Sequence, residues 1–147
     1  MFIKQISVFM ENRPGRLTEI TKVLSDNNID MRAVNIADTA EFGILRMIVD
    51  NPVKAEEALR SNHMTASITE VFAVSIDDTV GAFHQVIALL KDAEINIDYI
   101  YSLIGEKSSR AVIVVKTNDN ERSVNILKNG GICVLSSEDL KDFKNAK

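Results

Sequence analysis

The chain has 147 residues, of which 46% are hydrophobic and 26% charged, and its formal net charge is −4. This size allows one medium domain or two small ones, each with a buried core. The negative charge argues against non-specific nucleic-acid binding, which needs clustered Lys and Arg to neutralise phosphates. Apolar runs such as residues 111–115 are far shorter than the roughly 20 residues of a membrane helix, and no export signal opens the sequence. We therefore expect a cytoplasmic protein that binds neither nucleic acid nor membrane.

The first half of the chain predicts the order strand, helix, strand, strand, helix, strand. Alternating apolar residues indicate a strand over about residues 2–10, and apolar residues at helical spacing follow the segment NRPG. Pro14 suits the first turn of that helix and Asn27 suits its end. The other predicted elements are a hairpin of strands 31–39 and 43–50 around TAEFG, a helix that Asn51 caps and that runs to about Arg60, and a strand near residues 65–71.

The second half of the chain repeats this pattern. A shift of 66 residues brings Gly15 onto Gly81 and GILRMIVD onto SRAVIVVK, and the register then slips by two around TNDNE, where Leu59 meets Leu127. The second unit therefore predicts strands at 72–77, 97–103, 110–116 and 132–135 and helices at 80–93 and 120–129. A short helical turn in SSEDLKDF, capped by Ser136 or Ser137, is expected to follow.

This order of elements predicts the fold class. Two βαβ halves with right-handed crossovers place both helices of a unit on one face of a four-stranded antiparallel sheet. The prediction is an α+β fold of two ferredoxin-like βαββαβ domains, residues 1–70 and 71–147. Because almost no linker separates them, we expect the domains to pack side by side with pseudo-twofold symmetry.

The segment ENRPGRLTEI, together with NNIDMRAV, resembles the ACT domain, a small regulatory module that binds amino acids. The loop of that family has the form N-x-P-G between the first strand and the first helix, and Asn12, Pro14 and Gly15 match it here, with Leu17 following. Ile29-Asp30-Met31 stands where the family often has Val-Asn-Ile. The second unit keeps the glycine and an Asn-Ile pair but replaces the asparagine and proline of the loop.

The resemblance implies amino-acid binding at an interface between neighbouring ACT domains, with the loop of one domain facing the second strand of the other. Some members of the family have lost the ligand. The loop chemistry suits an α-carboxylate, because glycine admits a ligand close to the backbone and a helix start presents free amides. Asn12 offers a donor and an acceptor, and Arg13 and Arg16 strengthen the positive field unless they extend into water.

The same loop is also consistent with a structural role alone. Asn12 could cap a backbone amide, Pro14 could set the dihedral angle, and Gly15 could make room for helix–sheet packing. These two interpretations are compatible, so both stay open at this point.

Pairing about the pseudo-twofold predicts two unequal ligand sites. The first comprises Met10, Glu11, Asn12, Arg13, Pro14, Gly15, Arg16, Leu17, Asn96 and Ile97. The reciprocal, weaker site comprises Asp78, Val80, Gly81, Asp30 and Met31. Its two carboxylates would each repel an incoming carboxylate by about 1 kcal/mol at 4 Å in water. We therefore expect the first site to take the amino acid and the second to be empty, structural or cation-preferring.

No catalytic set, metal motif or cofactor motif is visible. His63 and His84 do not match under the repeat and are interpreted as surface or edge residues, and Cys133 in GGICVL is interpreted as a buried thiol. The sequence thus predicts a non-catalytic sensor that binds an amino acid, needs no cofactor and forms a homodimer. The alternative is a regulatory subunit of a partner enzyme, since the loop is similar to that of the acetolactate synthase small subunit, although the C-terminal half of that subunit is a different domain.

Overall fold

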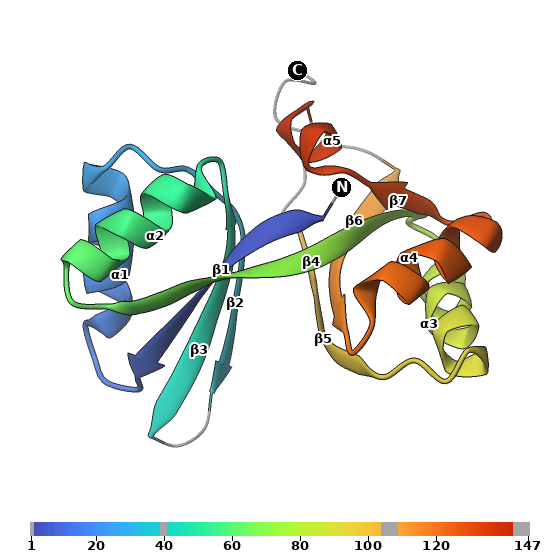
Figure 1. Cartoon of the computed structure of the whole chain (residues 1–147), viewed down its shortest axis with the longest axis horizontal. Helices are drawn as coiled ribbons and strands as arrows, with labels where there is room; N and C mark the ends of the chain where they lie inside the picture. Colours follow the sequence, from blue (N-terminus) through green and yellow to red (C-terminus); the bar gives the residue numbers. More distant parts are fainter. Residues whose placement is uncertain (1, 39–40, 104–108, 143–147) are drawn as a thin grey trace. The chain divides into compact units, whose positions relative to one another are not determined.

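The computed structural model describes residues 2–38, 41–103 and 109–142 (Figure 1). The chain forms two compact units. One comprises residues 4–69, and the other comprises residues 70–147 together with residues 1–3. Each unit has a four-stranded sheet and a pair of helices on one face, which confirms the predicted α+β fold built twice from a βαββαβ unit.

The unit of residues 4–69 has the strand order β2-β3-β1-β4, and its β1–β3 and β2–β3 pairs are antiparallel. One face of β1 packs against both helices, where Val8 lies in a core with Leu24 and Leu59. The predicted hairpin turn includes residues 39–40, which lie outside the described residues. The elements are β1 (Ile3–Glu11), α1 (Arg16–Asp26), β2 (Met31–Asp38), β3 (Phe42–Val49), α2 (Pro52–Ser61) and the first part of β4 (Thr65–Asp77).

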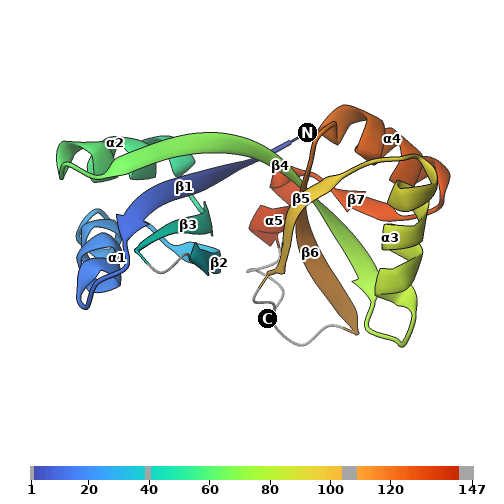
Figure 2. The ribbon, with the colours of Figure 1, turned by 90° about the horizontal axis from the view of Figure 1, so that it is seen from below.

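The unit of residues 70–147 has the strand order β5-β6-β4-β7. Helices α3 and α4 cover one face of this sheet (Figure 2). The core of the unit includes Phe72, Leu90 and Leu127. The elements after β4 are α3 (Ala82–Asp92), β5 (Ile97–Ser102), β6 (Arg110–Thr117), α4 (Asn120–Asn129), β7 (Cys133–Leu135) and α5 (Ser137–Asp142).

β4 differs from the prediction of two strands at 65–71 and 72–77, because it is one strand of 13 residues. No glycine or proline interrupts it, and both Val71 and Phe72 at the expected break are buried. The observed units divide the chain inside this strand, between Thr69 and Glu70.

The position of the register slip between the repeats also differs from the prediction. Val8 pairs with Leu45 in one unit, and Val74 pairs with Ile113 in the other. Leu45 therefore corresponds to Ile113, a shift of 68 residues, before TNDNE is reached. The two extra residues lie in the connection between β5 and β6, because a hairpin loop accepts an insertion without disturbing the paired strands.

Side chains cap two of the helices as the sequence indicates. Asn51 accepts a hydrogen bond from the Lys54 amide at the start of α2. Ser136 and Asp139 form a reciprocal cap at α5, in which the Ser136 amide donates to Asp139 Oδ2 at 2.6 Å. This hydrogen bond, and a second from the Ser136 hydroxyl, hold the pKa of Asp139 below its usual range.

Cys133 is exposed, so the prediction of a buried thiol is wrong. The cysteine opens a strand of only three residues, and it is the neighbouring Val134 that packs against the core. His63 and His84 are exposed. Among the residues that the structure describes, no cluster of His, Cys, Asp or Glu could hold a metal ion. Within the same ranges, no helix is long and apolar enough to cross a membrane.

Candidate functional site

The two loops before α1 and α3 have the same backbone conformation. Gly15 and Gly81 are the N-cap residues, with φ values of 83° and 90°. The amide of Asn12 donates to the Glu41 carbonyl at 2.9 Å, and the amide of Asp78 donates to the Ser109 carbonyl at 2.8 Å. Each loop is therefore anchored to the hairpin of its own unit in the same way.

Glycine is required at these two positions by the backbone conformation and not by a lack of space for a side chain. A Cβ at Gly15 or Gly81 would meet no atom within 4 Å, but a φ near +85° is left-handed backbone that other residues rarely adopt. Helix α1 begins at Arg16, so Pro14 precedes the cap and does not occupy the first turn as predicted. Likewise α3 begins at Ala82 and not at Val80.

Neither α1 nor α3 has a side chain that caps its first turn. The N-cap position of α1 is Gly15 and not Asn12. In contrast, Asn51 caps α2 and the Asp119 side chain accepts from the Arg122 amide at α4. The first amide of each helix donates to a loop carbonyl, from Arg16 to Arg13 and from Ala82 to Thr79, each at 3.3 Å. The dipole of a helix start still favours an external anion there.

The arginines of the first loop are held by carboxylates of the same unit. Arg16 Nη1 lies 2.8 Å from Glu19 Oε2, and Arg13 Nη2 lies 3.3 Å from the same oxygen. Arg13 Nε also lies 3.2 Å from Glu11 Oε2. The hydrogen bond from Arg16, followed by the charge of Arg13, lowers the pKa of Glu19. Glu19 thus supplies the anion that the cations at this helix start require, a role that sequence reasoning missed.

The starts of β2 and β5 have matching hydrogen bonds but different charges. The amide of Asp30 donates to Asp50 Oδ1 at 3.1 Å, and the amide of Asn96 donates to Asn118 Oδ1 at 3.2 Å. The return bonds also match, from the Asp50 amide to the Asp30 carbonyl and from the Asn118 amide to the Asn96 carbonyl. One strand start therefore carries two carboxylates where the other carries two neutral amides.

A groove of about 370 Å³ lies beside the acidic strand start. Residues from the second half of α1 and from the start of β2 line it, together with Asp50. Met31, on its rim, is 39% exposed. The groove combines two carboxylates with neutral polar and apolar side chains and contains no basic residue among those that line it, so its field favours a cation over an anion.

The remaining predicted site residues have varied surroundings. Met10 is buried in the core beneath the first loop, and Leu17 is 38% exposed. Val80 is fully exposed at the tip of the second loop, and Ile97 packs against the core of its unit. Each predicted site combines the loop of one unit with the strand start of the other. The geometry given above is that of each part within its own unit.

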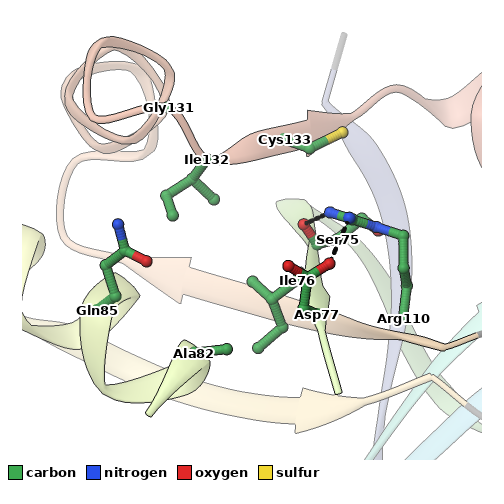
Figure 3. Close-up of a pocket in the computed structure, with 9 residues that line it drawn as sticks. All are labelled: Ser75, Ile76, Asp77, Ala82, Gln85, Arg110, Gly131, Ile132 and Cys133. Carbon is green, nitrogen blue, oxygen red and sulfur yellow. Dashed lines mark hydrogen bonds and ion pairs between the residues drawn. The ribbon is translucent and has the colours of Figure 1, made fainter. Parts of the chain in front are cut away.

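A second pocket, of about 120 Å³, lies near the end of β4 in the unit of residues 70–147 (Figure 3). Arg110 extends over this end of the sheet and donates to Ser75 Oγ and the Ser75 carbonyl, each at 2.8 Å. Its Nη1 donates to Asp77 Oδ1 at 2.7 Å. This guanidinium is therefore engaged by its own unit, and Cys133 lies beside it in the pocket wall.

The chain is thus a pair of small α+β domains, each a βαββαβ unit whose first helix follows a left-handed glycine. The chain matches the family described as ACT domain pair over residues 1–143, and it belongs to that family. No functionally curated protein matches the chain.

Solved structures agree with this assignment. The chain is similar to protein BT0572 from Bacteroides thetaiotaomicron, with 38% identity, a TM-score of 0.88, and coverage of 95% of this chain and 96% of that one. It is also similar to the regulatory subunit of aspartate kinase from Thermus thermophilus, with 17% identity, a TM-score of 0.62, and coverage of 86% and 91%. The corresponding subunit from Thermus flavus has 16% identity, a TM-score of 0.61, and coverage of 87% and 92%. At these lower identities the likeness shows the fold.

Proposed function

We propose that this ACT domain pair is a non-catalytic cytosolic regulatory protein that binds an amino acid and acts as a homodimer. The ligand carboxylate binds backbone amides in the first turn of α1, and Asn12 and Asn96 bind its polar groups. Binding at a seam between domains biases their relative packing, which is how the ligand would be reported to a partner.

The observation that carries this proposal is the contrast between the helix starts. Side chains cap α2 and α4, whereas α1 and α3 start at left-handed glycines with no side-chain cap. Because the dipole of a helix start attracts an anion, an α-carboxylate is a suitable ligand for it. The ACT domain pair family gives the same expectation for this loop.

The charges of the strand starts support one ligand per chain. The proposed first site combines the loop of Asn12 with the neutral pair Asn96 and Asn118. The reciprocal site combines Asp78 with Asp30 and Asp50, and its three carboxylates disfavour a ligand carboxylate. We therefore propose that the reciprocal site stays empty or accepts a cation.

A thermal-shift screen against the twenty amino acids tests binding. A ligand at 100 times its dissociation constant stabilises the protein by about 2.7 kcal/mol, which gives a clear shift. Calorimetry with the best ligand should then find one site per chain. Asn96→Asp should weaken binding, whereas the matched control Asp30→Asn, at the equivalent position of the other unit, should leave this site intact. No shift with any amino acid, or two equal sites per chain, would contradict the proposal.

The second candidate is a regulatory subunit that docks on a biosynthetic enzyme. Two of the similar structures are described as regulatory subunits of aspartate kinase, which supports this class of role for the fold. Affinity purification of the full chain from its native cells tests it. A large catalytic subunit that copurifies in stoichiometric amount, and whose activity the chain alters, would favour this candidate.

A further inference from the structure

Three large apolar side chains are exposed together on the sheet of residues 4–69. Phe9 on β1 is 50% exposed, and Phe42 and Ile44 on β3 are 43% and 37% exposed. The two phenyl rings are stacked with their centroids 5.2 Å apart, and Phe9 is the cross-strand partner of Ile44. We call these three residues the aromatic surface.

The aromatic surface lies on the face of the sheet opposite the helices. Helices α1 and α2 cover one face of this sheet (Figure 1). Side chains alternate along a strand, and the neighbours Val8 and Met10 on β1 lie in the core with residues of α1 and α2. Leu45 and Met47 do the same on β3. The stacked rings therefore contribute nothing to the core beneath the helices.

The second repeat shows that the fold does not require aromatic residues at these positions. In the strand registers, Phe9 corresponds to Ser75 and Phe42 corresponds to Arg110. Arg110 donates to Ser75 and to Asp77, which corresponds to Glu11 (Figure 3). The same place in the fold thus holds a hydrogen-bonded polar cluster in one unit and exposed rings in the other.

Charged residues flank the aromatic surface in a self-complementary way. Glu11, which also pairs with Arg13 of its own copy, lies at one end, opposite Phe42 in the register. Arg46 lies two residues beyond Ile44 at the other end. Four residues along a strand span about 13 Å, so these opposite charges bracket the apolar centre. A twofold axis through that centre would bring Glu11 of one copy near Arg46 of the other.

We propose that the aromatic surface docks against the same surface of a second copy of this chain. An exposed cluster of large apolar side chains marks an interaction site, and the arrangement of charges matches an isologous contact. The three side chains offer on the order of 250 Å² of apolar area per copy, less than the roughly 800 Å² of a standard interface. The aromatic surface is therefore the centre of a small interface, and the dimer dissociates on dilution.

Sedimentation velocity of the full chain over a range of concentrations tests the proposal. The wild-type chain should pass from monomer to dimer as its concentration rises. Phe9→Ser combined with Phe42→Arg should weaken association at least 30-fold. These substitutions copy the residues of the second repeat, and the introduced guanidinium can bond to Glu11 as Arg110 bonds to Asp77, so the fold should be kept. Circular dichroism checks this.

Three further variants make the test specific. Val53→Ser removes an apolar side chain that is 47% exposed on α2, and it should leave association unchanged. Arg46→Glu should weaken association about tenfold, and adding Glu11→Arg should restore it. Ile36→Lys, on the edge strand β2, should have no effect.

This inference rests on the homodimer proposed above, and the outcomes separate the two. A wild-type chain that stays monomeric at every concentration overturns both. A dimer that survives Phe9→Ser with Phe42→Arg, or one that Ile36→Lys abolishes, overturns only the aromatic surface and favours pairing of strand edges. Charge reversal at Arg46 without rescue by Glu11→Arg overturns the twofold register.

Discussion

Substitution by alanine and by asparagine should change the stability of the protein in opposite orders at Gly15 and at Gly130. Gly15 has a φ of 83° and open space around the position of a Cβ. Gly130 has an ordinary φ of −81°, but a Cβ there would lie 2.6 Å from Leu89 Cδ1. The first glycine is thus required by backbone conformation and the second by packing.

The structure allows the cost of each change to be estimated. Left-handed backbone costs an alanine about 1–2 kcal/mol, and restricting the unfolded chain returns about 0.4–1 kcal/mol, so Gly15→Ala should destabilise by roughly 1 kcal/mol. Gly15→Asn should cost less, because asparagine tolerates this conformation. Gly130→Ala should cost at most about 1 kcal/mol, because the flexible end of Leu89 can move and restricting the unfolded chain again returns about 0.4–1 kcal/mol. Gly130→Asn should cost more than Gly130→Ala, because it is larger.

Urea denaturation followed by circular dichroism measures these differences as changes in the transition midpoint at constant slope. The decisive quantity is the order of the alanine and asparagine variants at each position. If Gly15→Asn were less stable than Gly15→Ala, space and not dihedral angle would limit Gly15. If Gly130→Asn were as stable as the wild type, the contact with Leu89 would not restrict that position.

Two further predictions concern helix starts in the unit of residues 4–69. Asn51→Ala should remove the hydrogen bond that Asn51 accepts from the Lys54 amide and lower the free energy of unfolding by about 1 kcal/mol, measured by urea denaturation, while Asn51→Asp should keep most of it. In an NMR titration the pKa of Glu19 should lie below the usual range of a glutamate, because Arg16 and Arg13 lower it. The stabilisation from these contacts is therefore present at neutral pH and is lost as the pH falls through the folded-state pKa. Arg16→Gln should raise that pKa, and an unchanged pKa would contradict the assigned cause.

Much of the fold could be predicted from the sequence because the chain carries the pattern twice. Apolar alternation and helical spacing located every strand and helix to within a few residues, and Asn51 and Ser136 indicated caps that the structure contains. The continuity of β4 was missed, because two strand patterns that meet without a turn do not reveal whether the backbone bends. The exposure of Cys133 was missed because it depends on which face of a short edge strand the residue occupies.

The candidate site was predicted less completely, for two physical reasons. The engagement of Arg13 and Arg16 by Glu19 depends on the reach of long side chains, which residue spacing alone does not determine. Asp50 was missed because the register slip was placed too late, which matched Asp50 with Lys116. The strand registers and the shared hydrogen bonds match it with Asn118 instead.

The paired hydrogen bonds at the starts of β2 and β5 allow the charge at each strand start to change without a change of backbone. Aspartate and asparagine have nearly the same shape, and in both units a side-chain oxygen accepts the backbone amide. Exchanging one pair for the other therefore changes the local charge by two while every acceptor is retained. A chain built in this way can acquire a new electrostatic preference through isosteric exchanges, without a new backbone.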